Sequence, residues 1–171
     1  MRASADATLR RLGGPGQWLL NLPPTYVAGL QVLFRSVRAG TDPVVDDDVR
    51  AGAAAMTGGR RYVSLVPTQL HRLLDEPEAV AALRTFSTVL VGGAAVPASL
   101  REHAAAAGVT VVATYGMSET CGGCVYDGMP LDGVAVVVGS DGRIRIGGPV
   151  LFDGYDGRPD LTTEVLADGW F

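Results

Sequence analysis

Short apolar runs alternate with helix-like segments along most of this chain, and that alternation restricts the fold more than any other feature. The runs lack alternating polar positions, which is typical of strands covered on both faces. Strands joined through intervening helices lie parallel, with the helices on the faces of the sheet. The sequence therefore predicts an α/β fold, with a mostly parallel sheet flanked by helices. The expected strands are 18–22, 43–45, 62–66, 88–91 and 109–113.

Glycine, proline and acidic residues set the expected limits of the helices. Gly40 and Gly108 follow helix-like segments, where a residue that tolerates left-handed backbone is favoured. Pro97 opens another helix, because the first turn does not need the N–H that proline lacks. Carboxylates at 46–48 favour the positive end of a helix dipole. The expected helices are 3–11, 26–39, one that begins at 46, one that begins at 67, 77–83 and 97–107.

The pattern of the sequence changes after residue 125. Two apolar segments, 134–138 and 143–146, are separated by Ser140-Asp141-Gly142, which indicates a β-hairpin. We therefore expect a small antiparallel β element at the C-terminal end. On this basis the chain is divided into an α/β part, 1–125, and a β-rich subdomain, 126–171.

Composition limits the classes of function. The formal net charge is -4, which argues against a nucleic-acid partner. No stretch approaches the roughly 20 apolar residues of a membrane span. Residues 1–11 lack the apolar core of a signal peptide, so a cytoplasmic location is the expectation. The 14 basic residues are all arginine, and a mechanism that requires lysine must obtain it from elsewhere.

The first candidate ligand loop, 91–95, follows a predicted strand at the edge where ligands bind in open α/β sheets. Gly92, Gly93 and Ala94 would let a flat ligand approach the backbone closely. A tight strand-to-helix turn without a ligand explains the same spacing.

The second candidate loop is 114–120, which gathers hydroxyl groups, a carboxylate and an aromatic ring. Tyr115 could stack on a base, and Ser118 and Thr120 could donate hydrogen bonds to phosphate oxygens. Glu119 could hold Mg²⁺ against those phosphates, because Mg²⁺ favours a carboxylate together with substrate oxygens. A polar loop without a ligand remains the alternative.

The residues Tyr115-Gly116-Met117-Ser118-Glu119-Thr120 resemble the Tyr-Gly-x-Thr/Ser-Glu signature of the adenylate-forming superfamily. This superfamily contains acyl-CoA ligases, luciferases and peptide-synthetase adenylation domains. Ordered matches across about 80 residues are more specific than any one motif. The further matching segments are 91–94, 142–149 followed by Gly154-Tyr155, and Asp168-Gly169-Trp170-Phe171.

Within the superfamily, residues 116–134 look most like actinobacterial o-succinylbenzoate–CoA ligases of menaquinone synthesis. The resemblance implies a reaction in two steps. The carboxylate of an acid attacks the α-phosphate of ATP and gives an acyl-adenylate, and the thiol of coenzyme A then displaces AMP. The implied ligands are therefore a small carboxylic acid, ATP with Mg²⁺, and coenzyme A.

The resemblance also implies roles for individual residues. Glu119 would bind Mg²⁺ and, with Ser118 at the phosphate, form the catalytic pair. Tyr115 would cover the adenine face. The implied nucleotide-binding residues are Gly92, Gly93, Ala94, Thr114, Tyr115, Gly116, Met117 and Ser118. The implied acyl-pocket residues are Tyr26, Val27, Gly29, Thr68, Gly116 and Gly122.

Several parts of the family pattern are not found in this sequence. A phosphate loop that ends in Pro-Lys-Gly would precede it, and the ribose-binding aspartate and the C-terminal lysine domain would follow it. The chain is thus expected to be an internal piece that does not catalyse the full reaction alone. Many acyl-CoA ligases also have a histidine where Tyr26 stands, so substrate choice or the order of steps could differ.

Other functions remain open from the sequence. One is a non-catalytic nucleotide-binding remnant or interaction module, and another is a ligase for malonate or an aryl acid. Exposed sheet edges would favour self-association, with a homodimer as one form. Cys121 and Cys124 could form half of a zinc site or a redox pair, but both are disfavoured. Zinc needs two more ligands, and a redox Cys-x-x-Cys normally starts a helix, whereas Gly122-Gly123 suits a turn.

Overall fold

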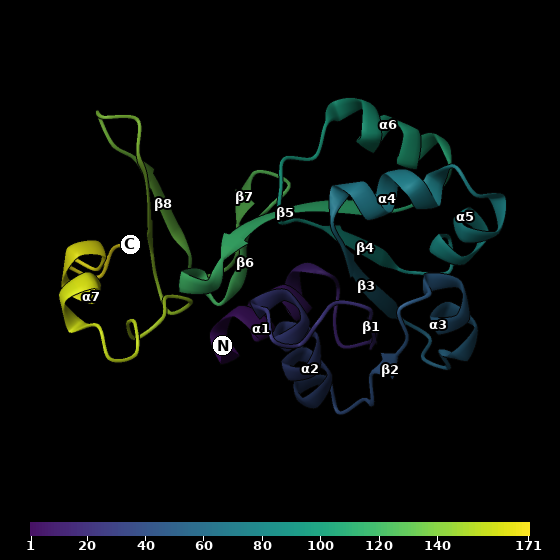
Figure 1. Ribbon diagram of the computed structural model, residues 1–171, viewed down its shortest axis with the longest axis horizontal. Coiled ribbons are helices and arrows are strands. Elements are labelled where there is room, and N and C mark those ends of the chain that lie inside the picture. Colours follow the sequence, from purple (N-terminus) through teal and green to yellow (C-terminus); the bar gives the residue numbers. More distant parts are fainter.

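The computed structural model describes residues 1–171, and its main body is a seven-stranded sheet between two layers of helices (Figure 1). The strand order is β2-β1-β3-β4-β5-β6-β7. The strands of this sheet are β1 (Gln17–Leu20), β2 (Val44–Val45), β3 (Arg61–Leu65), β4 (Thr88–Val91), β5 (Val111–Met117), β6 (Gly122–Tyr126) and β7 (Met129–Pro130).

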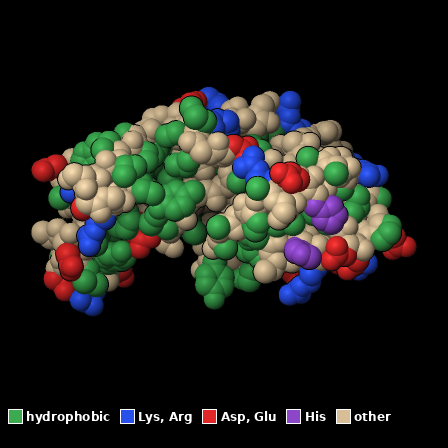
Figure 2. All heavy atoms as spheres, turned by 90° about the horizontal axis from the view of Figure 1, so that it is seen from above, with side chains coloured by type: hydrophobic (Ala, Val, Ile, Leu, Met, Phe, Trp, Pro, Cys, Tyr) green, Lys and Arg blue, Asp and Glu red, His purple; other side chains and the backbone are tan.

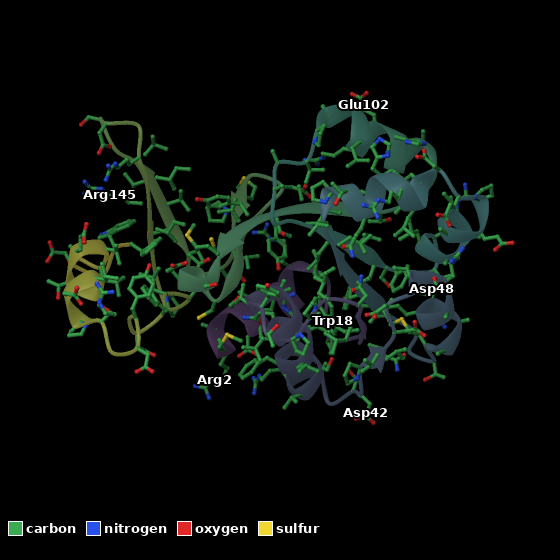
Figure 3. All side chains as sticks on the ribbon, in the orientation of Figure 1. Arg2, Trp18, Asp42, Asp48, Glu102 and Arg145 are labelled. Carbon is green, nitrogen blue, oxygen red and sulfur yellow. The ribbon has the colours of Figure 1, made fainter.

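The helices divide between the two faces of the sheet. One core cluster joins the sheet to α3 (Val49–Ala55), α4 (Pro67–Leu74), α5 (Pro77–Leu83) and α6 (Ala98–Ala106). A second cluster contains residues of the layer formed by α1 (Arg2–Arg11) and α2 (Val27–Ala39). Trp18 is fully buried and points into this second layer (Figure 3).

Strands β1 to β5 pair in parallel, which confirms the predicted fold class. Where the sequence carries local signals, the expected ends of the helices lie close to the observed ones. Gly40 ends α2 in left-handed backbone with φ 67°, and the side chain of Asp48 caps α3 by accepting from the N–H of Arg50. Pro97 is the residue before α6, so this helix begins one position later than expected.

The end of β5 departs from the expectation. The strand continues through Tyr115 to Met117 and pairs antiparallel with β6, so only Ser118–Thr120 forms a short 3-10 turn. The predicted turn at Gly122-Gly123 is wrong, because both residues belong to β6. A Cβ on Gly116 would lie 2.7 Å from the Cα of Gly123, so glycine permits this close pairing of backbones.

The C-terminal segment forms a separate two-stranded sheet, which confirms the predicted hairpin. Its strands, β8 (Ala135–Val138) and β9 (Ile144–Gly147), are antiparallel, and α7 (Pro159–Val165) follows them. Because β7 still belongs to the main sheet, the architecture changes after Pro130. The division into two subdomains stays a proposal.

Apolar side chains reach the surface on this C-terminal part. Val137, Val138 and Ile144 of the hairpin are all exposed. Figure 2 shows the molecular surface hollowed between this part and the α/β body. None of the helices has the length and hydropathy required to cross a lipid bilayer.

Candidate functional site

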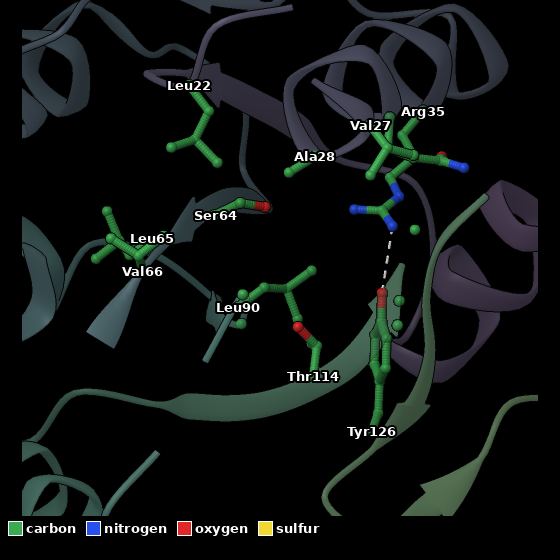
Figure 4. Close-up of a pocket in the computed structure, with 16 residues that line it drawn as sticks. Leu22, Val27, Ala28, Arg35, Ser64, Leu65, Val66, Leu90, Thr114 and Tyr126 are labelled. Carbon is green, nitrogen blue, oxygen red and sulfur yellow. Dashed lines mark hydrogen bonds between the residues drawn. The ribbon is translucent and has the colours of Figure 1, made fainter. Parts of the chain in front are cut away.

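A cavity of about 140 Å³ lies between α2 and the ends of the central strands (Figure 4). Its walls come from α2, from the ends of β3 and β4 with the residues that follow them, and from the paired strands β5 and β6. The lining residues are Leu22, Val27, Ala28, Gln31, Arg35, Ser64, Leu65, Val66, Leu90, Gly92, Gly93, Thr114, Gly116, Gly122, Gly123 and Tyr126. We call it the inner cavity.

An open cleft of about 540 Å³ adjoins the inner cavity and shares Gly93, Thr114 and Gly116 with it. We call it the outer cleft. It lies between the loop after β4 and the strand β5, and small side chains and backbone form most of its wall. The remaining lining residues are Ala94, Ala95, Val96, Ala113, Tyr115, Val125 and Gly128.

Glycine is required at the junction of the two spaces. A Cβ on Gly92 would overlap the hydroxyl oxygen of Thr114, which lies on the neighbouring strand. The Thr114 hydroxyl in turn donates to the carbonyl of Val91 at 3.4 Å. Gly93 has φ +80°, a left-handed backbone that other residues rarely adopt. This turn therefore brings bare backbone to the edge of the outer cleft.

Glu119 lies in the 3-10 turn beside these spaces, although it lines neither. Its Oε1 accepts a hydrogen bond of 2.8 Å from the hydroxyl of Tyr155, and its carbonyl accepts from the N–H of Phe152. The bond to Glu119, together with burial, raises the pKa of the Tyr155 hydroxyl. One carboxylate oxygen of Glu119 thus has a fixed partner, and the other has none among the protein's side chains.

Thr120 does not offer a hydroxyl group to a ligand. It is fully buried, donates to the carbonyl of Gly122 at 2.7 Å and accepts from the N–H of Met117 at 2.9 Å. This residue therefore stabilises the turn that presents Glu119. Cys124 is also fully buried, and burial raises the pKa of its thiol, which makes a thiolate ligand for a metal unfavourable.

Arg35 is the least expected feature of the inner cavity. It is only 3% exposed and none of the salt bridges of the chain includes it. Its Nη2 donates to the hydroxyls of Thr8 and Tyr126, each at 3.3 Å, and its guanidinium centre lies 5.0 Å from the ring centroid of Trp18. Its Nε is buried without a partner. The cavity thus contains a desolvated positive charge that no carboxylate of the protein neutralises.

Comparison with known proteins identifies the family. The model of the family described as AMP-binding enzyme matches residues 4–156, which is most of the chain. The chain belongs to the AMP-binding enzyme family. This confirms the resemblance that the Tyr115–Thr120 motif indicated.

Curated members of this family are similar to the whole chain but much longer. A probable 2-succinylbenzoate–CoA ligase of Mycobacterium tuberculosis H37Rv is 51% identical, and the alignment covers 100% of this chain and 46% of that protein. The 2-succinylbenzoate–CoA ligase of Escherichia coli K12 is 33% identical, covering 99% of this chain and 38% of that protein. The chain thus spans less than half the length of the relatives it matches.

Solved structures share the fold of this chain. The o-succinylbenzoate coenzyme A synthetase of Bacillus subtilis, in complex with ATP and magnesium ion, superposes with a TM-score of 0.84 at 26% identity. The alignment covers 99% of this chain and 41% of that one. The N-terminal domain of FACL13 from M. tuberculosis gives a TM-score of 0.81 at 23% identity, which shows a common fold alone.

The structure brings together many of the residues that the sequence indicated. Gly93, Ala94, Thr114, Tyr115 and Gly116 line the outer cleft. Val27, Gly92, Gly116 and Gly122 line the inner cavity. Met117 instead packs against the small core that includes Ile146 of β9, and Ser118 is exposed without lining either space.

Three of the residues expected in the acyl pocket lie elsewhere. Tyr26 is 70% exposed, and Gly29 packs against the backbone carbonyls of Leu22 and Pro23. Thr68 lines an open pocket between α4 and α6 that also includes His71 and His103. These two histidines lie on one surface of the molecule (Figure 2).

The sequence interpretation missed Arg35 and Tyr126, although one signal for Arg35 was present. The buried positions of α2 include Gln31 and Val32, so helical spacing places Arg35 on the inward face one turn later. A charged residue at an inward helical position is rarely fully buried without a partner or a function. No comparable pattern distinguished Tyr126.

Proposed function

We propose that this chain is the acid- and nucleotide-binding part of an ATP-dependent ligase that converts o-succinylbenzoate into its coenzyme A thioester. The relatives of the chain are named as ligases of this acid, and related B. subtilis structures contain ATP with magnesium or the acyl-adenylate OSB-AMP. The parent reaction belongs to menaquinone biosynthesis. The cytoplasmic location stays a prediction.

The observation that carries this proposal is the unpaired guanidinium of Arg35 in the inner cavity. o-Succinylbenzoate has two carboxylates, one on a succinyl chain and one on the aromatic ring. The chain carboxylate reacts with ATP, so the ring carboxylate requires a partner in a site without water. A ligand carboxylate should stabilise a buried arginine that has no acidic neighbour, because charge-assisted hydrogen bonds are strong in such a site.

The outer cleft suits the adenine and ribose of ATP. The bare backbone of Gly92, Gly93 and Ala94 would meet the edge of the base, and Tyr115, whose side chain is exposed, would cover its face. The cleft opens toward the inner cavity at Gly116, which both spaces share. The α-phosphate and the acid would therefore meet near this residue, and Ser118 would donate to a phosphate oxygen.

Glu119 suits Mg²⁺, because this ion takes one or two protein carboxylates together with phosphate oxygens. One of its oxygens is held by Tyr155, and the protein gathers no cluster of three metal-binding side chains that would compete for the ion. When bound, Mg²⁺ would neutralise phosphate charge as pyrophosphate leaves. The protein residues would position the acid carboxylate for in-line attack and exclude water.

The complete reaction needs groups that these 171 residues do not contain. The chain has no lysine, and the family's phosphate loop and lysine domain are not among its motifs. We therefore predict no pyrophosphate release by this chain alone from ATP and o-succinylbenzoate. Clear turnover would contradict this prediction. A non-catalytic nucleotide-binding module, or a ligase of another acid, is the competing proposal.

Calorimetry with two acids separates these proposals. o-Succinylbenzoate should bind more tightly than 3-benzoylpropionate, which lacks only the ring carboxylate, by roughly tenfold or more. Arg35→Met should abolish the difference. Arg38→Met is the matched control, because Arg38 lies on the same helix but pairs with Asp6 at the surface. Equal affinity of the wild-type chain for both acids would reject o-succinylbenzoate as the substrate.

A further inference from the structure

The side chains of Thr8, Arg35 and Tyr126 form a closed triangle of hydrogen bonds beside the inner cavity. The Nη2 of Arg35 lies 3.3 Å from each hydroxyl oxygen, and the two oxygens are 3.0 Å apart. Thr8 comes from α1, Arg35 from α2 and Tyr126 from β6. The triangle therefore joins three elements at one wall of the cavity.

The protons in this triangle can be assigned by counting donors. The guanidinium only donates, so its two Nη2 hydrogens go to the two hydroxyl oxygens. Either hydroxyl can donate to the other, but Thr8 is fully buried away from the inner cavity, whereas Tyr126 lines it, so we assign the proton of Thr8 to the oxygen of Tyr126. The Tyr126 oxygen then accepts two bonds, and its proton has no acceptor within the protein.

The proton that this assignment leaves on Tyr126 is available to a ligand in the inner cavity. Tyr126 and Arg35 line the inner cavity, whereas Thr8 does not. Figure 4 shows the hydrogen bond between the two lining residues, and Ser64 on the opposite side of the space. Gly123 makes room for the phenol, because a Cβ there would lie 2.7 Å from its ring and 3.3 Å from its hydroxyl. The wall thus presents a hydroxyl donor next to a cation.

We propose that Tyr126 is a specificity-determining residue that donates its hydroxyl proton to the carboxylate bound by Arg35, and that Thr8 is the positioning residue that directs this proton. The inference rests on the proposed function, because it concerns the ring carboxylate of the acid. A carboxylate offers two acceptor oxygens, and the adjacent guanidinium and phenol supply donors for both. An acid without this group would leave both donors unpaired.

Three variants test the triangle by calorimetry, with o-succinylbenzoate and 3-benzoylpropionate as the probes. Tyr126→Phe removes the donor, and Thr8→Val removes the group that directs it while keeping the side-chain shape. Each should weaken o-succinylbenzoate binding roughly tenfold and leave 3-benzoylpropionate unchanged. Thr8→Ser retains the hydroxyl and should restore the wild-type affinity ratio.

Tyr62→Phe is the matched control for the loss of a buried tyrosine hydroxyl. The Tyr62 hydroxyl donates to the carbonyls of Leu12 and Gly14, and the residue does not line the inner cavity. Its removal should change neither affinity. Unchanged binding of 3-benzoylpropionate also serves as the test that each variant keeps its fold.

The outcomes separate the triangle from the proposed function. If Tyr126→Phe and Thr8→Val bind like Tyr62→Phe while Arg35→Met loses its preference, the role of the triangle is overturned and the proposed function stands. If Thr8→Ser is as weak as Thr8→Val, the role of Thr8 is overturned. If the wild-type chain binds both acids equally, the proposed function fails and the inference fails with it.

Discussion

The inner cavity and the outer cleft meet at Gly116 but are built from different kinds of structure. The outer cleft is lined mainly by backbone and small side chains of the loop after β4 and of the strand β5. The inner cavity depends on large polar side chains that come from separate elements, with Thr8 behind its wall. A backbone-lined site tolerates changes in its surroundings, whereas a side-chain site depends on every partner. The two spaces should therefore respond differently to substitution.

Gly116→Ala should have the largest effect, because it alters the wall that both spaces share. The added Cβ would overlap the backbone of Gly122 and lie 2.7 Å from the Cα of Gly123, so β5 and β6 must separate. We expect a loss of about 3 kcal/mol in the free energy of unfolding, measured by urea denaturation.

Gly59→Ala is the control for this substitution. Its added Cβ would meet no atom within 4 Å, and Gly59 does not have positive φ. We expect little change in its stability. A Gly116→Ala chain as stable as the Gly59→Ala chain would show that the β5–β6 pairing can move apart freely.

Gly123→Ala should alter ligand binding in the inner cavity but not in the outer cleft. The added Cβ would displace the ring of Tyr126, and this change reaches the inner cavity without touching the outer cleft. We expect o-succinylbenzoate affinity to fall by roughly tenfold, while the affinity for Mg²⁺·ATP stays within about twofold of wild type. Calorimetry with each ligand separately checks this. An equal loss for both ligands would mean that the two spaces are one coupled site.

The contrast explains which parts could be predicted from the sequence. The limits of α5 and β4 agree with the expectation, because proline and short apolar runs act locally. The glycine turn at 92–93 was recognisable for the same reason. The triangle was not, because Arg35 finds its partners 27 and 91 positions away. The strand β6 was missed because Gly122 and Gly123 suggest a turn, and only the structure shows that Gly123 pairs with Gly116 across the sheet.

Tyr155→Phe tests the part of the proposed site that would bind Mg²⁺·ATP. It removes the hydroxyl that holds Oε1 of Glu119 at 2.8 Å, so the carboxylate should lose its fixed orientation. We expect the affinity for Mg²⁺·ATP to fall roughly fivefold, with o-succinylbenzoate binding unchanged. The raised pKa of Tyr155 means that this bond is complete below the ordinary tyrosine range and is lost as pH rises through the higher value.

The exposed Tyr26 supplies the matched control, because its hydroxyl has no hydrogen bond within the protein. Tyr26→Phe should leave Mg²⁺·ATP binding as it is in the wild type. Titration with MgCl₂ at fixed ATP shows whether the metal dependence shifts, which a general loss of packing would not produce. If Tyr155→Phe and Tyr26→Phe have the same metal dependence, Tyr155 has no part in presenting Glu119.

The smallest expected effect comes from Asp48, which lies far from both spaces and should change neither affinity. Its side chain caps α3 and pairs with Arg50, and these hydrogen bonds lower its pKa. A lowered pKa in the folded state gives stability that is present above the ordinary carboxyl range and is lost as pH falls through the lowered value. Asp48→Ala should lower the melting temperature by roughly 2–4 °C at pH 7.

Asp48→Asn should lower the melting temperature less than Asp48→Ala, because asparagine retains the cap. The Asp48→Asn and wild-type curves should converge on acidification, since protonation removes the charge that distinguishes them. A difference that persists at pH 2 would assign the effect to packing and not to charge.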